Sequence, residues 1–170
     1  MSIKSQVWTT DFIISIMLFI ALFLLFGKTI FDLTNDSKED IVPLITEGRA
    51  VSDSLISEGY PVNWNNATVS KIGLTADNRI DASKISAFYS MNYSEAKRLF
   101  NTPYDFFVFL SDENNKLISV EGNYGFGNPA INATQDNVTL SGVDFERLAK
   151  IDRIVIYDSK IVKMVVYLWD

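Results

Sequence analysis

A long apolar run near the N-terminus restricts this chain more than any other feature. Across residues 12–26 only Ser15 is polar. As an α-helix this run covers roughly 22 Å, and the flanking residues 7–11 and 27–30 extend it to the ~30 Å of a bilayer core. The run lacks the polar stripe that the core helix of a soluble protein has, so we predict a transmembrane helix.

The apolar run has two alternative interpretations. A cleaved secretory signal peptide ends in a small-x-small pattern, which the residues after Phe26 do not contain. A helix buried in a soluble core is the second alternative. For topology, a ten-residue tail stays in the cytoplasm more readily than roughly 140 following residues, so we expect the bulk of the chain outside, with the helix as a single-pass anchor.

The residues just before the apolar run read Lys4-Ser5-Gln6. They resemble the class III signal peptide of archaeal type IV pilins and related surface filaments. In that family a membrane peptidase cuts before a glutamine, and the apolar helix stays on the product. The resemblance implies cleavage between Ser5 and Gln6, which removes Lys4 and moves the net charge from −6 to −7.

An aspartate, Asp11, stands at the start of the apolar run. The family commonly carries an acidic residue at the fifth mature position, whereas here Thr10 is fifth and Asp11 is sixth, counted from Gln6. One interpretation is a helix N-cap formed by Thr10 or Asp11. The other is an assembly contact in which Asp11 pairs with the new terminal amine of Gln6, on its own or a neighbouring subunit, and so relieves the cost of a buried charge.

Composition limits the function classes. A net charge of −6 without a Lys/Arg cluster argues against a nucleic-acid partner. The chain has no cysteine and no histidine, which removes thiolate metal sites, the commonest metal ligand and the commonest general base. We therefore expect no enzymatic activity, catalytic residue, metal or cofactor. A carboxylate-dependent hydrolase is a distant alternative for which no pair of acids can be nominated.

Residues after the apolar run predict a continuing helix. The economical prediction is one long helix from Trp8 to about Glu58, bent at Pro43 or with Pro43 in a new first turn, and stopped before Gly59. Ser37 and Asp40 resemble a capping box. In the loop that follows, Trp64 is interpreted as an anchor packed under the loop, with stacking on a ligand as the alternative.

The C-terminal part of the chain predicts two short helices and two hairpins. Asp81 is expected to cap the first helix, and Asn92 or Ser94 the second. Residues 104–110 and 116–122 are predicted to form one hairpin, and residues 153–169 another that turns at Asp158-Ser159-Lys160. Between them, we expect an exposed loop at residues 123–140 and a helical turn at residues 142–152.

The predicted fold class is α+β: a long, kinked N-terminal helix packed on a small antiparallel sheet of about four strands, with short extra helices. The predicted organisation is a leader at residues 1–5, an apolar transmembrane and assembly helix at residues 6–30, and an extracytoplasmic head at residues 31–170. Five Asn-x-Ser/Thr sequons make surface glycosylation of the head an expectation, at Asn35, Asn66, Asn92, Asn132 and Asn137.

The function expected from these features is structural: a pilin, minor pilin or pseudopilin that assembles into a surface filament through its apolar helix. By resemblance its partners are like subunits, a prepilin peptidase, and an assembly ATPase with its membrane platform. Its location is then the membrane, with an extracellular C-terminal domain, or a cell-surface filament. The alternative is a monomeric, membrane-anchored extracellular binding domain, in which Asp11 is only a cap.

Overall fold

The computed structural model describes residues 3–170, without the side chains of residues 3–8 and 32–40. It is an α+β structure in which α1 (Ile3–Leu55) contains the apolar run. Contacts divide the chain into two compact units, Met1–Asp40 and Ile41–Asp170, and we call the second unit the head. The head comprises the last part of α1 together with β1 (Thr75–Ala76), β2 (Arg79–Ile80), α2 (Ala82–Tyr89), α3 (Tyr93–Phe100), β3 (Asp105–Ser111), β4 (Phe126–Gly127), β5 (Asn132–Ala133), β6 (Val138–Thr139), β7 (Leu148–Tyr157) and β8 (Lys160–Trp169).

The single long helix is confirmed, and Pro43 lies inside it. A bend at this proline stays a prediction. The capping box at Ser37 and Asp40 is wrong, because α1 continues through both positions and no helix begins there. The helix ends at Leu55, and Gly59 follows with a positive φ of 74°, which a glycine adopts without steric cost.

A four-stranded antiparallel sheet with the order β4-β3-β8-β7 organises the head. Successive side chains along each strand point to opposite faces of the sheet, and both faces are apolar. On β3, Phe106, Val108 and Leu110 point to one face, while Phe107 and Phe109 belong to the cluster on the other. The sheet is therefore a central layer with a separate core on each side.

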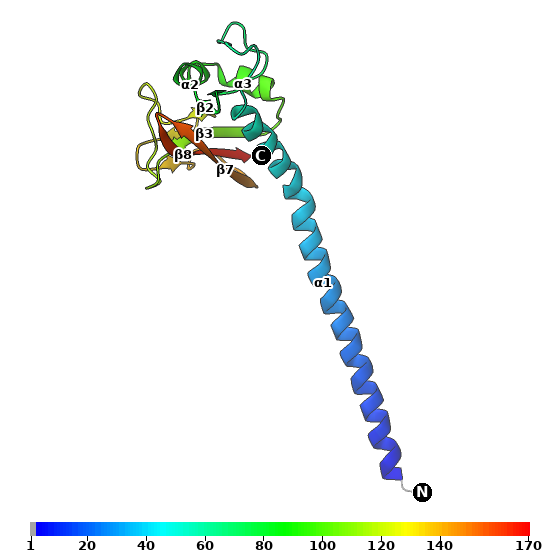
Figure 1. Ribbon diagram of the computed structural model, residues 1–170. Coiled ribbons are helices and arrows are strands. Elements are labelled where there is room, and N and C mark those ends of the chain that lie inside the picture. Colours follow the sequence, from blue (N-terminus) through cyan, green and yellow to red (C-terminus); the bar gives the residue numbers. More distant parts are fainter. Residues whose placement is uncertain (1–2) are drawn as a thin grey trace. The chain divides into compact units, whose positions relative to one another are not determined.

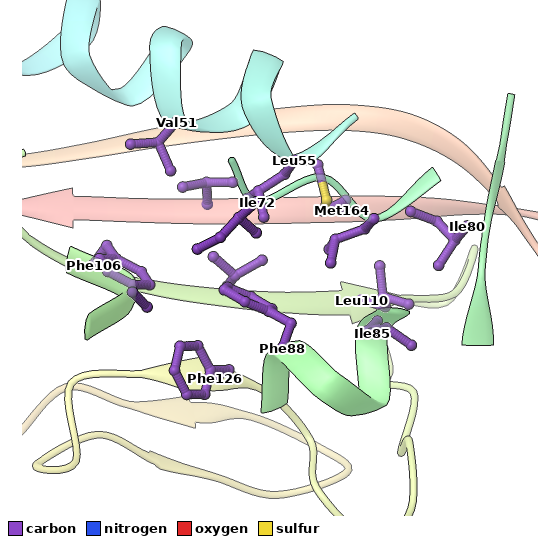
Figure 2. Close-up of a cluster of buried hydrophobic side chains, with 14 of the residues drawn as sticks. Val51, Leu55, Ile72, Ile80, Ile85, Phe88, Phe106, Leu110, Phe126 and Met164 are labelled. Carbon is purple, nitrogen blue, oxygen red and sulfur yellow. The ribbon is translucent and has the colours of Figure 1, made fainter. Parts of the chain in front are cut away.

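The first core lies between the sheet and the helices. Figure 1 shows α2 and α3 on one side of the strands, and Figure 2 shows side chains from these layers converging. Phe88 of α2 is fully buried, with its ring centroid 4.5 Å from that of Phe126 and 6.1 Å from that of Phe100. The part of α1 in the head contributes Leu44, Val51 and Leu55, each at most 1% exposed. Burial of these residues holds the end of α1 to the sheet.

Both short helices form where the sequence predicts them. The Asp81 carboxylate accepts hydrogen bonds from the amides of Ser83 and Lys84, at 2.8 and 3.1 Å, and so caps α2. Asn92, rather than Ser94, caps α3 by accepting from the Ser94 amide at 2.9 Å. These caps satisfy amides that have no partner inside the helix.

The last hairpin is confirmed but is longer than predicted. Its turn is Asp158 and Ser159, both with positive φ, as a two-residue type I′ turn requires, whereas Lys160 already pairs with Tyr157. The predicted helical turn before it is wrong, since β7 begins at Leu148, opposite Trp169. The last residues of β8 have apolar side chains on both faces of the sheet. Pairing with β7 provides hydrogen-bond partners for the backbone N–H and C=O groups of β8 there.

The first predicted hairpin is only partly correct. β3 forms, and the polar turn after Ser111 is present, but residues 116–122 make no regular strand. Leu117 forms an isolated bridge with Ser111, and Phe126 and Gly127 then take over the edge of β3 opposite Val108 and Phe107. The predicted exposed loop at residues 123–140 is also wrong in part, because β4, β5 and β6 lie within it and Ile131 is buried in the second core.

Helix α1 packs tightly against β7 at Gly48. A Cβ atom at this position would lie 2.2 Å from Cδ1 of Ile151, which is less than any real contact distance. Cδ1 is the end of the Ile151 side chain and can rotate away, so we predict that Gly48→Ala lowers the free energy of unfolding by no more than about 1 kcal/mol, with the better helix propensity of alanine offsetting part of the overlap. Ile151→Val removes the overlapping atom, so the double variant should recover most of that loss in urea unfolding. Equal losses in the single and double variants would contradict this packing.

Candidate functional site

The apolar part of α1 is the most unusual surface of the molecule. It spans Thr9–Phe31, 23 residues, of which none is buried. Phe12, Phe19 and Phe26 are 64%, 67% and 71% exposed. At ~1.5 Å per residue the segment is roughly 34 Å long, so it is long and apolar enough to span a bilayer.

Polar groups in this segment are few and placed in ways that suit an apolar surrounding. The Thr29 hydroxyl donates to the Leu25 carbonyl at 2.9 Å, so it needs no external partner. Asp11 and Lys28 are the charged residues between Thr9 and Phe31, one near each end. A charge near an end can reach the polar interface of a membrane, whereas one at the centre cannot.

The structure corrects one interpretation of Asp11. Because α1 begins at Ile3, Thr10 and Asp11 lie inside the helix and neither is its N-cap. Asp11 is an exposed residue of the helix surface. Its proposed partner at Gln6, and the cleavage position between Ser5 and Gln6, lie outside the described side chains.

A polar cluster in the head surrounds Asp105. Its carboxylate accepts hydrogen bonds from the Tyr93 hydroxyl at 2.6 Å, the Lys97 ammonium at 2.7 Å and the Asn128 amide at 3.2 Å. Burial opposes ionisation of this carboxylate, but the hydrogen bonds from Lys97, Tyr93 and Asn128 outweigh it and lower its pKa. The cluster holds α3, β3 and the residue after β4 together, and its carboxylate is fully engaged by donors.

Two further head residues have a structural role. Lys84 is 5% exposed and donates to the carbonyls of Glu58 and Thr75 at 2.8 and 2.7 Å, which joins α2 to the chain just after α1. Nothing in the sequence distinguishes Lys84 from a surface lysine. Trp64 is 4% exposed and its indole N–H donates to the Gly73 carbonyl at 2.7 Å, which confirms the predicted anchor and contradicts stacking on a ligand.

Four of the five sequons have described asparagine side chains, and all four are exposed: Asn66, Asn92, Asn132 and Asn137. Asn35 lies outside the described side chains. Asn132 and Asn137 are in the strand pair β5–β6 and its turn, close together in sequence. Their exposure leaves them accessible to a modifying enzyme.

The surface of the head also has a hollow beside the turn of the β7–β8 hairpin. It measures about 570 Å³ and lies between the acidic pair Asp112 and Glu113 and the strand residues Tyr157 and Ile161. Ile161 is 74% exposed, and the nearby Ile154 is 80% exposed. Within residues 9–31 and 41–170, no group of three or more Asp or Glu side chains is arranged to hold a metal ion.

No protein-family model, curated protein or solved structure matches this chain.

Proposed function

We propose that this chain is a structural subunit of a type IV pilus-like surface filament, assembled through its N-terminal apolar helix and without enzymatic activity. One observation supports this most strongly: Thr9–Phe31 is entirely exposed, while the head has complete cores of its own. Exposed apolar surface of this extent requires an apolar environment, which a bilayer and a bundle of like helices both provide.

The mechanism is transfer of the helix from one apolar environment to another. The subunit is held in the membrane by residues 9–31 until assembly, with its head outside. Its helices then leave the bilayer and pack against those of neighbouring copies. Asp11 pairs with the terminal amine of Gln6 after cleavage, which compensates both charges in the bundle and restricts the axial register of the helices.

The proposed partners follow from this mechanism. A prepilin peptidase would cut between Ser5 and Gln6, and an assembly ATPase with its membrane platform would drive extraction from the bilayer. The heads would form the filament surface, and the exposed sequons would carry glycans there.

Shearing of cells tests this function. Surface filaments broken off by shear are expected to contain the chain as a main or minor component. A chain that stays wholly with the membrane, under conditions in which filaments are made, contradicts the proposal.

Asp11 gives a prediction about the assembly contact. Removing one partner of a buried ion pair costs about 3–5 kcal/mol, so we expect Asp11→Ala to lower the yield of sheared filaments more than tenfold while membrane insertion is retained. Asp144→Ala, a matched change at an exposed position of the head, should leave the yield unchanged. Normal filaments from the Asp11 variant would rule out the pairing.

A second function has one observation in its favour. The hollow between Asp112, Glu113 and Ile161 combines an exposed apolar wall with acidic groups, as a binding surface for another envelope component would. In that case the chain is a monomeric, membrane-anchored binding domain, and it should keep residues 1–5.

A further inference from the structure

A groove runs along the head between α1 and β7. It measures about 400 Å³ and is lined by Ile41, Ile45 and Arg49 of α1 and by residues 148–152 of β7. β7 is an outer strand of the four-stranded sheet, so no further strand pairs with its free edge within the sheet. Beside the groove, Gly48 leaves room for the Ile151 side chain, so that α1 packs closely on the strand.

Positive charge borders this groove. Arg49 is exposed and has no ion-pair partner among the described residues. Lys150 is 52% exposed and lies 3.3 Å from the Asp152 carboxylate. Two cations and one anion give this border a net charge of +1. Ile41 and Ile45 are only partly buried, so the groove offers apolar surface together with positive charge.

A segment of opposite charge occurs in α1. Residues 36–40 read Asp-Ser-Lys-Glu-Asp, with a net charge of −2. If the α1 helices of two copies packed in parallel without an axial offset, residues 36–40 of one copy would lie beside residues 36–40 of the other. The negative charges of the two segments would then repel each other. An offset of about nine residues, roughly 14 Å, instead places residues 36–40 of one copy beside residues 45–49 of the other.

The same offset preserves apolar contact between the helices. With this offset, residues 9–22 of one copy lie beside residues 18–31 of its neighbour, and both stretches belong to the exposed apolar segment, while residues 23–31 lie beside the more polar residues 32–40. We infer that the groove between α1 and β7 receives residues 36–40 of α1 from a second copy of this chain. This inference rests on the proposed filament, and it specifies how one head contacts the helix of its neighbour.

Disulfide cross-linking tests the contact in intact filaments, since the chain has no native cysteine. Two differently tagged full-length copies are produced together, one carrying Lys150→Cys and the other Ser37→Cys. A mixed disulfide-linked dimer is expected. The matched control pairs Ser37→Cys with Arg98→Cys, at an exposed residue of α3 outside the groove, and should give at least fivefold less mixed dimer.

Charge reversal gives a second, independent readout. Arg49→Glu with Lys150→Glu is expected to lower filament yield at least fivefold, and adding Asp36→Lys and Glu39→Lys should restore it to within twofold. Thermal melting of the head identifies variants that fail only because they are unfolded. If the wild type forms filaments but the Lys150→Cys and Ser37→Cys copies give no more mixed dimer than the control pair, or the Arg49→Glu, Lys150→Glu variant keeps its full yield, the groove contact is wrong and the filament proposal stands. Absence of wild-type filaments overturns both.

Discussion

We expect Ile20→Arg to remove the protein from both the membrane and the filament fraction. Ile20 lies at the centre of Thr9–Phe31 and is 51% exposed. An arginine at the centre of a transmembrane helix costs about 2.5–3.5 kcal/mol, and loss of the isoleucine adds a few tenths. The equilibrium constant for membrane insertion should therefore fall roughly 100- to 1,000-fold, measured from the carbonate-resistant fraction of cell membranes.

The control for this change is Val62→Arg, which places the same charge at an exposed apolar residue of the head. A surface substitution of this kind changes stability by less than about 0.5 kcal/mol, and the membrane fraction should be unaffected. If the Ile20 variant inserts and assembles like the wild type, residues 9–31 are not in an apolar environment and the proposed role of this helix is wrong.

The second large effect is expected in the head. Phe88 is fully buried, and its ring contacts those of Phe100 and Phe126 across α2, α3 and β4. Phe88→Ala leaves a cavity where these elements meet, and such changes cost about 3–5 kcal/mol. A domain of this size has a total stability of about 5–15 kcal/mol, so the urea midpoint of the variant should fall by about a fifth or more.

Phe145→Ala is the matched comparison, because Phe145 is 41% exposed. The same deletion of a ring should cost under about 1 kcal/mol there, since little packing is lost. Similar losses at both positions would show that the core between α2 and the sheet is not what stabilises the head.

Features with a strong local signal are predictable from this sequence. The apolar run has no polar interruption except Ser15, so it predicts a long apolar helix, which the structure contains. Asp81 and Asn92 precede apolar helical patterns and cap α2 and α3 as expected. The β-branched residues on either side of Asp158 and Ser159 define the last hairpin, whose turn chemistry is local.

Features that depend on contacts distant in sequence are not predictable in the same way. Residues 116–122 look like a strand, but Leu117 donates its amide to the Gln135 carbonyl and Ile118 donates to Leu110, so neighbouring residues have different partners. The start of β7 at Leu148 is determined by the length of β8 rather than by its own composition. The close packing of α1 on β7 depends on Gly48, whose role becomes visible only when α1 lies on the sheet.

In the candidate site, too, some features follow from local sequence patterns and others from contacts between distant residues. The apolar helix and the exposed sequons follow from short sequence patterns, and exposure of four asparagines agrees with them. The capping interpretation of Asp11 is wrong because Ile3 and the residues after it are already helical, although they contain no strong start signal. The roles of Lys84 and Asp105 required the folded head, since their partners come from separate elements.

The N-terminal mass of the protein recovered from its native membranes and from sheared filaments tests the central claim most directly. We predict a chain that begins at Gln6 and still contains residues 9–31 joined to the head, in both fractions. A chain that retains Met1 throughout, or one that begins after Phe26, would contradict the proposed filament subunit.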